Sequence, residues 1–499
     1  MEYQLYFKKK CASSLSIPLC KLSNLSLSKG KVPDIWKEAI VVPIFKKGLK
    51  NNPNNFRPIS LTSAICRTLE KILQNKIIHH LTENLLLSKS QHGFLPYRST
   101  LSLHLNLMDD LTTELSKKKY VDMLYLDFSK AFDRVSHEKL IHCLTKYKID
   151  IRILNWLKDY LSSRSQRTIV ENIFSNRCNI TSGVPQGSVM GPLLFLLYIE
   201  DLLKLLNQNF PSINAYAFAD DLKILGSDRN TLQQALDEII IWTQNWQLKI
   251  QHSKSEYITF KTPHTHSPDI NPNYNINNNT FAKTDIVKDL GLYLTNNLTW
   301  TQYINKVHHK SNSLGHIILK SFSSQQPSLY IQLYKTYVRP LLEYNVSIWT
   351  PHLVHDIKLA ENTQRTFTRK LCKKLNISYN NYLDRLKLLN IESLEYRRLK
   401  QDLILLYKII NDLIDVGNIN LFTKSQATNK YNLRRHSLYL DKSKQNQSSI
   451  RQYFFSNRII NTWNKLPNLI VTSPTLSIFK NRINQFSLQT VYKFYFNET

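Results

Sequence analysis

The sequence predicts an α+β protein with a helical C-terminal region, and three features of the chain lead to this prediction. The stretch Asn214–Leu225 runs from apolar residues through two adjacent aspartates to a second apolar run, which is typical of two strands joined by a tight turn. Another apolar run, Met123–Leu126, indicates a strand that ends at Asp127. From Trp300 onward the apolar residues follow helical spacing. A first part that contains strands, followed by a part that is helical, is typical of the α+β class.

Apolar periodicity and glycine or proline breaks place the remaining elements. Before Trp300, helices are predicted at Cys11–Leu27, Leu69–Leu81, Leu101–Leu115, Glu138–Tyr147, Ile153–Leu161, Leu193–Asn207 and Thr231–Gln247. Strands are predicted at Ala39–Phe45, as a pair within Arg164–Cys178, at Glu256–Phe260 and at Val287–Leu294. After Trp300, helices are predicted at Gln302–Leu319, Leu329–Val338, Lys358–Lys374 and Leu394–Ile414. The stretch Thr423–Gln452 reads as a basic linker or nucleic-acid arm, and short helices follow up to Gln485.

The balance of charge points to a polyanionic partner. The 499 residues contain 66 Lys and Arg against 37 Asp and Glu, a formal net charge of +29 at pH 7 that is spread along the whole chain. Solvated helix faces explain part of this excess, but its size and distribution favour nucleic acid as the partner. Membrane-surface binding is the weaker alternative, because no basic amphipathic helix stands apart from the rest.

Composition excludes several classes of protein. Apolar residues make up 42% and aromatic residues 11% of the chain, which is enough for packed cores and argues against disorder. The six cysteines include no CxxC pair, so neither a disulfide framework nor a zinc knuckle is expected, and a reducing intracellular compartment fits. No apolar run reaches transmembrane length, and no signal-peptide core follows Lys8–Lys10.

The acidic strand ends form the candidate catalytic centre. Taken alone, Asp220 and Asp221 are ordinary hairpin-turn residues. Asp127, however, closes a second strand. Two carboxylate-tipped strands that converge would provide the hard oxygen ligands that Mg²⁺ needs in order to carry phosphates.

Basic and glycine-rich stretches supply candidate substrate contacts. Lys46–Gly48 and Phe56–Ile59 belong to a basic hairpin, which suits phosphate binding but is also common on exposed surfaces. Phe132, on the turn after Asp127, is either a core aromatic or a wall against a sugar. Three of the ten glycines fall in Ser182–Pro192, so this segment is expected to lie against a substrate.

An ordered set of motifs resembles one known family. The motifs are FRPISL at Phe56–Leu61, QHGF at Gln91–Phe94, YLDFSKAFD at Tyr125–Asp133, SGVPQGSVMGPLLF at Ser182–Phe195, AFADD at Ala217–Asp221, KSEYITF at Lys254–Phe260, DLGLYL at Asp289–Leu294, LYKTYVRPLLEY at Leu333–Tyr344 and FFSNRIINTWNKLP at Phe454–Pro467. In this order they resemble the reverse transcriptases of non-LTR (LINE-type) retrotransposons, jockey-like in particular, over almost the entire chain. Phe218 in place of the commoner Tyr, Tyr97 in place of a small residue and Gln251 in place of Asn depart from the family pattern.

The resemblance implies a right-hand polymerase with fingers, palm and thumb, in which an antiparallel palm sheet is followed by a helical C-terminal region. It implies four parts of the chain: a helical extension at residues 1–38, fingers and palm at 39–298, a helical thumb or connection at 299–420, and a basic linker with a C-terminal helical segment at 421–499. Within the fingers and palm, Leu290 and Gly291 would lie in the strand that supports the primer terminus.

The resemblance also implies an RNA-directed DNA polymerase that adds deoxynucleotides to a primer 3′-hydroxyl by two-metal catalysis. Carried over residue by residue, Asp127, Asp220 and Asp221 would hold Mg²⁺, or Mn²⁺ in its place. The residues that would contact the incoming nucleotide are Lys47, Arg57, Phe132, Gln186, Gly187 and Lys254. In particular, Phe132 would exclude a ribose 2′-hydroxyl, and Lys254 would protonate pyrophosphate.

The implied partners are an RNA template, a DNA primer or target DNA and deoxynucleotides, in an intracellular ribonucleoprotein in the nucleus or cytoplasm, with no membrane. Relatives usually carry an N-terminal endonuclease that this sequence does not contain, so a partner would have to nick the target. Two alternatives stay open. The first alternative to an RNA-directed DNA polymerase is a catalytically silent, truncated element product that binds nucleic acid. The second is an RNA-directed RNA polymerase, although Phe132 argues against it.

Overall fold

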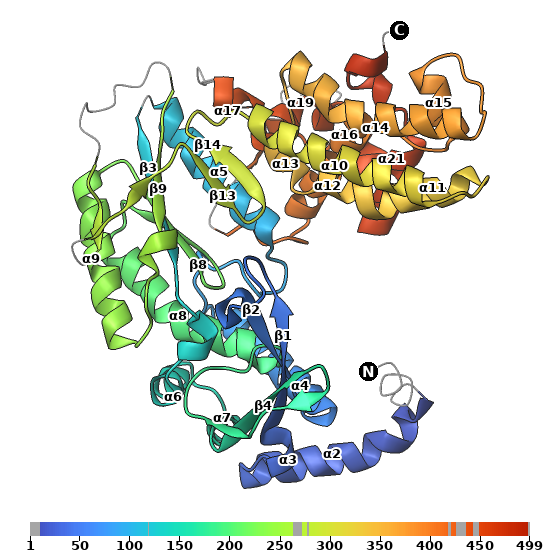
Figure 1. The fold of residues 1–499 in the computed structure, drawn as a ribbon. Helices are drawn as coiled ribbons and strands as arrows, with labels where there is room; N and C mark the ends of the chain where they lie inside the picture. The colour runs from blue at the N-terminus through green and yellow to red at the C-terminus, as the bar shows by residue number, and fades with distance from the viewer. Residues whose placement is uncertain are drawn as a thin grey trace. The chain divides into compact units, whose positions relative to one another are not determined.

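The computed structural model describes residues 10–117, 119–262, 272–276, 279–417, 421–425, 436–442 and 449–497, and the chain divides into two compact units (Figure 1). Unit 1 comprises Met1–Pro96, Leu124–Glu256 and Pro272–Ala282. Unit 2 comprises Tyr97–Met123, Tyr257–Asn271 and Lys283–Thr499. No helix among the described residues is long and apolar enough to cross a membrane.

The described strands form two larger sheets and three two-stranded hairpins. The first sheet has the order β2-β1-β4-β5, with β6 paired to β4, and contains β1 Glu38–Phe45, β2 Phe56–Leu61, β4 Arg164–Val170, β5 Ile173–Phe174 and β6 Cys178–Ile180. The second has the order β12-β9-β3-β8-β7 and contains β3 Val121–Asp127, β7 Asn214–Phe218, β8 Asp221–Gly226, β9 Glu256–Phe260 and β12 Ala282–Lys283. The hairpins are β10 Asn275–Ile276 with β11 Asn279–Thr280, β13 Ile286–Asp289 with β14 Leu292–Thr295, and β15 Thr423–Lys424 with β16 Leu440–Asp441.

The described helices of unit 1 overlap predicted helices, with ends that differ by up to five residues, except for the short helix α3, which was not predicted. They are α2 Ala12–Lys29, α3 Asp34–Lys37, α4 Ala64–Glu83, α6 His137–Lys146, α7 Ile151–Leu161, α8 Met190–Asn209 and α9 Arg229–Asn245, with the 3₁₀ turns η1 Pro53–Asn55, η2 Ala131–Arg134 and η3 His252–Lys254. Ser63, Ser136 and Asp228 begin α4, α6 and α9 with side chains that accept hydrogen bonds from first-turn amides.

Helix α8 forms the core of unit 1. Every residue from Leu193 to Ile199 is at most 1% exposed, as expected from a helix that is apolar nearly all round. The helix contacts β7, α4, α6 and α9. Because α8 is packed on several sides, it gives β7 a rigid support directly before the acidic turn.

The first sheet presents the basic hairpin predicted from the sequence. Strands β1 and β2 pair antiparallel, with Ile44 opposite Arg57 and Phe45 opposite Phe56. Strand β4 joins the other edge of β1 in parallel. Ala39 and Val41 are buried, whereas the far end of the hairpin is exposed, so its cations face solvent.

The helices of unit 2 pack around a largely aromatic core. They are α5 Thr100–Ser116, α10 Thr301–Ser321, α11 Pro327–Leu333, the π-helical segment η4 Tyr334–Val338, α12 Arg339–Glu343, α13 Val346–Trp349, α14 Val354–Lys374, α15 Tyr382–Leu388, α16 Leu394–Ile410, α17 Ser449–Tyr453, α18 Phe455–Arg458, α19 Ile460–Asn464, α20 Asn468–Val471 and α21 Leu476–Gln485, followed by the 3₁₀ turns η5 Leu488–Thr490 and η6 Tyr495–Asn497. The rings of Tyr334 and Phe367 stack with centroids 4.8 Å apart, beside the buried Tyr330 and Leu371.

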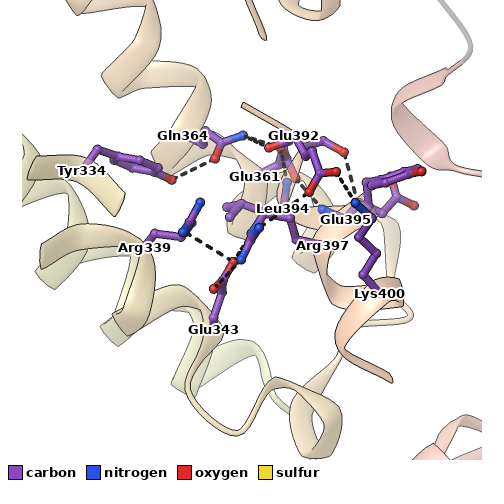
Figure 2. Close-up of polar contacts among 12 residues, drawn as sticks. Tyr334, Arg339, Glu343, Glu361, Gln364, Glu392, Leu394, Glu395, Arg397 and Lys400 are labelled. Atoms are coloured by element: carbon purple, nitrogen blue, oxygen red, sulfur yellow. Dashed lines mark hydrogen bonds and ion pairs between the residues drawn. The ribbon is translucent and has the colours of Figure 1, made fainter. Parts of the chain in front are cut away.

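A largely buried polar network joins four helical segments of unit 2 (Figure 2). The carboxylate of Glu361, on α14, accepts hydrogen bonds from the amides of Leu394 and Glu395 at 2.9 and 3.1 Å, which caps the start of α16. Gln364 accepts a hydrogen bond from the hydroxyl of Tyr334 at 3.0 Å. Arg397 of α16 pairs with Glu343 of α12. Since these polar groups have partners, the network stabilises one arrangement of the helices.

One predicted strand, Val287–Leu294, is wrong. The structure forms a hairpin there, in which β13 and β14 pair and Asp289 lies opposite Leu292. Leu290 has φ 43° and Gly291 has φ 97°, and two successive positive φ values are those of a type I′ hairpin turn. Leu290 and Gly291 therefore form a turn and not the interior of a strand.

Two other predictions concern segments of unit 2. The predicted helix Leu329–Val338 is present, but it widens to π-helix at Tyr334–Val338. Pro340 follows in α12 and has no N–H to continue the α-helical ladder. Most of the predicted basic linker lies outside the described residues, at 426–435 and 443–448.

Candidate active site

The predicted strand–turn–strand at residues 214–225 is confirmed. Strands β7 and β8 pair antiparallel, and Phe218 opposite Asp221 is the last pair before the turn. The two turn residues are Ala219 and Asp220. Ala219 has φ 58°, a conformation that L-residues with a Cβ adopt at a cost of about 1 kcal/mol or more, so surrounding contacts must hold it.

Asp127 lies at the end of β3, where the segment 249–255 runs beside it. Its carbonyl accepts a hydrogen bond from the amide of Gln251 at 2.8 Å. The ammonium of Lys254 lies 3.1 Å from Oδ2 of Asp127. That oxygen is buried and accepts no hydrogen bond from the described residues, because the approach of Lys254 is an ion pair without hydrogen-bond geometry. The carboxylate of Asp127 thus interacts with a cation, Lys254, by charge, and its oxygens are of the hard type that divalent metal ions prefer.

Asp220 and Asp127 are electrostatically coupled. Burial raises the pKa of Asp220 above its ordinary value, and the negative charge of Asp127 raises it further, while Arg57 and Lys46 lower it. A divalent cation relieves the repulsion between two such carboxylates, so the donor set fits a hard metal ion. The predicted pair of acidic strand ends is therefore brought together in unit 1.

Asp221 is exposed at the first residue of β8. Among the described residues, no group of three or more His, Cys, Asp or Glu side chains is gathered so that it could hold a metal ion. The structure therefore brings Asp220 to Asp127 without drawing the neighbouring Asp221 into a three-carboxylate cluster.

The predicted phosphate-binding cations lie on the first sheet. Arg57 is exposed on β2, and its charge acts on Asp220. Lys47 is exposed in the loop after β1, whereas Lys46, one residue earlier, is the lysine whose charge acts on Asp220. From the sequence, Lys46 was named only as part of the basic hairpin and was not selected as a nucleotide contact. Its amide donates a 2.8 Å hydrogen bond to Asn55, which fixes it at the base of the loop.

Phe132 lies on the turn η2 and is held by two other aromatic rings. Its ring stacks on that of Phe195 with centroids 4.5 Å apart and planes 22° apart. The ring of Phe94 approaches edge-on at 6.5 Å. Phe195 is fully buried on α8, so Phe132 rests against a rigid support while remaining only half-buried itself.

Gln186 and Gly187 are placed against both η2 and β2. The side-chain amide of Gln186 donates a 2.9 Å hydrogen bond to Oδ1 of Asp133, and its carbonyl accepts one from the amide of Ser60 at 2.7 Å. Gly187 has φ 109°, and a Cβ there would lie 2.8 Å from the carbonyl oxygen of Ser60. The close approach that requires this glycine is therefore made to the chain's own backbone.

Like Lys46, Asp133 was not selected as a site residue from the sequence. Asp133 closes the motif YLDFSKAFD, five residues after Phe128, and its spacing from Asp127 gives no indication that it reaches Gln186. The feature of the sequence that could have identified Asp133 as a site residue is that it is the second aspartate of this motif.

Comparison with known proteins decides the family. Residues 44–316, more than half of the chain, match the family model described as "Reverse transcriptase (RNA-dependent DNA polymerase)". The chain belongs to this family. The match confirms the predicted right-hand polymerase fold, and members of this family generally depend on divalent metal ions.

Similar proteins from mobile elements confirm the predicted non-LTR type. The chain is 27% identical over 353 residues to "Probable RNA-directed DNA polymerase from transposon X-element" of Drosophila melanogaster, covering 68% of this chain and 38% of that protein. It is 24% identical over 346 residues to "RNA-directed DNA polymerase from mobile element jockey" of the same species, covering 66% and 37%. The chain therefore spans well under half the length of these reverse transcriptases.

Among solved structures, the comparison finds apo telomerase from Candida tropicalis. The telomerase is 11% identical to this chain, and the match has a TM-score of 0.42 and covers 81% of this chain and 67% of the telomerase chain.

Proposed function

We propose that this reverse transcriptase chain adds deoxynucleotides to a primer 3′-hydroxyl on an RNA template, with Asp127 and Asp220 holding two divalent metal ions and Asp221 completing the acidic set. The observation that carries the proposal is the convergence of two strand ends on one site. Burial and the charge of Asp127 both raise the pKa of Asp220, and Oδ2 of Asp127 is buried without a hydrogen-bond donor.

Mg²⁺, or Mn²⁺ in its place, is the proposed cofactor, because carboxylate oxygens are hard ligands. When bound, such ions activate the primer hydroxyl and neutralise the charge on the triphosphate during in-line displacement. The carboxylate of Asp127 comes from the end of β3 and that of Asp220 from the β7–β8 turn, so both ligands are on rigid elements.

The remaining roles concern the incoming nucleotide. Arg57 and Lys47, together with Lys46, bind the triphosphate by charge, Gln186 and Gly187 line the nucleotide pocket, and Lys254 donates a proton to the pyrophosphate. In this proposal Phe132 excludes a ribose 2′-hydroxyl, and the stacking of its ring on Phe195 suits a rigid steric barrier. These six predicted contacts and Lys46 together describe a deoxynucleotide site.

The proposed partners are an RNA template and a DNA primer or target DNA, which the net charge of +29 would attract. We propose that they are copied within an intracellular ribonucleoprotein. We also propose that residues 39–298 form fingers and palm, 299–420 the thumb or connection, 1–38 an N-terminal extension and 421–499 the basic linker and C-terminal helical segment.

Primer extension tests the proposed function. The chain is incubated with an oligonucleotide primer annealed to RNA, with Mg²⁺ and either deoxynucleotides or ribonucleotides. The proposal predicts extension with deoxynucleotides and little extension with ribonucleotides. Equal use of ribonucleotides would favour an RNA-directed RNA polymerase. Tight RNA binding without any extension would favour the catalytically silent, truncated element product.

A further inference from the structure

We infer that Gln91 is a positioning residue for the proposed reaction, because its side-chain carbonyl holds the backbone of the Ala219–Asp220 turn in the conformation that presents Asp220. The expected effect of Gln91 on the reaction rate rests on the proposed function. The claim that Gln91 holds the turn depends only on contacts within unit 1.

The first step is the docking of the segment that carries Gln91. Strand β7 is an edge strand of the second sheet, and its free edge is covered by Ser90–His92. The amide of Ala217 donates a 2.9 Å hydrogen bond to the carbonyl of Ser90, and the amide of His92 donates one to the carbonyl of Ala217 at 2.8 Å. Residues 90–92 thus pair with β7 like a short parallel strand, which fixes Gln91 beside the turn.

The second step is the side chain of Gln91 itself. Its Oε1 accepts a 3.0 Å hydrogen bond from the amide of Ala219 and a 2.8 Å hydrogen bond from the amide of Gly93. Gln91 is 1% exposed. A two-residue turn leaves the amide of its first residue without a partner in the hairpin ladder, so Oε1 satisfies a buried donor that water does not reach.

The third step is the backbone that this hydrogen bond restrains. Ala219 has φ 58° and is not a glycine, so its conformation must be imposed by neighbouring groups. Gly93 lies directly against it, since a Cβ at residue 93 would be 2.5 Å from the amide nitrogen of Ala219. Gln91 and Gly93 therefore hold the turn from one side, and the motif QHGF has a role that the nucleotide contacts do not explain.

The catalytic consequence follows from geometry. Asp220 is the second residue of the turn, so a change at Ala219 rotates the carboxylate relative to Asp127. A misplacement of about 1 Å in a reacting group costs roughly 100-fold in rate. Gln91 does not need to touch metal, primer or nucleotide in order to change the rate.

The test compares Gln91→Leu with Gln91→Glu. Leucine has a similar volume and no acceptor, whereas glutamate keeps a carboxylate oxygen for the amides of Ala219 and Gly93. Gln233→Leu is the matched control, because Oε1 of Gln233 also accepts a backbone hydrogen bond, from Asn275 at 3.0 Å, on the exposed side of α9.

The first readout is hydrogen exchange of peptides covering residues 214–225, measured without metal or substrate. Loss of the acceptor in Gln91→Leu is expected to speed exchange at Ala219 by about tenfold or more. Gln91→Glu and Gln233→Leu are expected to exchange there like the parent. Unchanged exchange in Gln91→Leu would overturn the inference.

The second readout separates positioning from folding. In Gln91→Leu we expect kcat to fall by roughly 10- to 100-fold and the half-saturating Mg²⁺ concentration to rise, with the Kd for primer–template unchanged. Gln91→Glu should recover most of kcat. Faster exchange with a parental kcat would overturn the positioning role. Absence of extension by the parent would instead refute the proposed function, while the exchange comparison still decides whether Gln91 holds the turn.

Discussion

The ammonium nitrogen of Lys254 lies 3.1 Å from Oδ2 of Asp127, and it also donates a 2.8 Å hydrogen bond to Gln251. The side chains of Lys254 and Asp127 are 49% and 31% exposed, so the pair contributes at most about 1 kcal/mol to stability. Lys254→Met should therefore change the free energy of unfolding by less than about 1 kcal/mol. If Lys254 donates a proton during the reaction, the single-turnover rate should fall by roughly 100-fold.

Urea unfolding and single-turnover extension check this prediction together. Lys249→Met, which removes another lysine of the segment beside Asp127, is the control for charge. A large loss of stability with a parental rate would mean that the ion pair is structural.

The hydrogen bond from Gln186 to Asp133 predicts a difference between two substitutions. Asp133→Asn keeps an oxygen that accepts the 2.9 Å hydrogen bond, and Asp133→Ala removes it. We expect Asp133→Ala to raise the KM for deoxynucleotides by about three- to tenfold, because Gln186 loses its orientation, while Asp133→Asn stays near the parent. Steady-state kinetics at saturating primer–template measures the effect. Equal KM values in all three proteins would show that Gln186 does not contact the nucleotide.

The stacking of Phe132 on Phe195 predicts how sugar selection can be weakened. Phe132→Ala removes the ring and should lower the preference for deoxynucleotides over ribonucleotides, expressed as the ratio of kcat/KM values, by about tenfold or more. Phe195→Leu keeps the barrier but loosens its support, so its effect should be smaller. Competition between the two nucleotide types measures the ratio. A parental ratio in Phe132→Ala would rule Phe132 out as the barrier.

His308 predicts a pH dependence of stability in unit 2. Its Nδ1 lies 2.9 Å from the hydroxyl of Thr363, and its Nε2 lies 2.9 Å from the side-chain nitrogen of Asn312. Burial lowers the pKa of His308 below its ordinary value of 6.5, and the charge of His309 lowers it further. The unfolded chain therefore takes up a proton first, and the stability contributed by neutral His308 is present above about pH 6.5 and lost as the pH falls below it.

Native-state hydrogen exchange of α10 and α14 measures this effect. The parent should lose more unfolding free energy between about pH 8 and pH 5 than His308→Gln, which has no titrating group. His142→Gln, a change at an exposed residue of α6, should leave the parental slope unchanged. Equal slopes in the parent and His308→Gln would contradict the prediction.

Much of the fold was predictable because its signals are local. The helix α8 and the acidic turn between β7 and β8 were each predicted from a short run of consecutive residues, and both are confirmed. The hairpin of β13 and β14 was missed because the apolar residues of Val287–Leu294 were assigned to one strand. Its signal was Gly291, which the type I′ turn requires.

The site was predictable only in part, because its geometry depends on contacts between distant segments. Asp127 and Asp220 could be predicted as site residues because each is a carboxylate at the end of a strand. By contrast, the contact of Gln91 with Ala219 joins residues 128 positions apart, and that of Gln186 with Asp133 joins residues 53 positions apart. Sequence spacing carries no information about such pairs. Lys46 was not singled out for another reason, since adjacent lysines are equivalent in a sequence and only the folded chain shows that the charge of Lys46 acts on Asp220.

The central claim is that Asp220 is a metal-binding carboxylate of an RNA-directed DNA polymerase. The most direct measurement is Mg²⁺-dependent extension of a DNA primer on RNA by the parent, by Asp220→Ala and by Asp237→Ala, which removes an exposed carboxylate on α9. We predict that the parent and Asp237→Ala extend the primer, whereas Asp220→Ala binds primer–template with an unchanged Kd but does not extend it. Extension by Asp220→Ala at the parental rate would contradict the account.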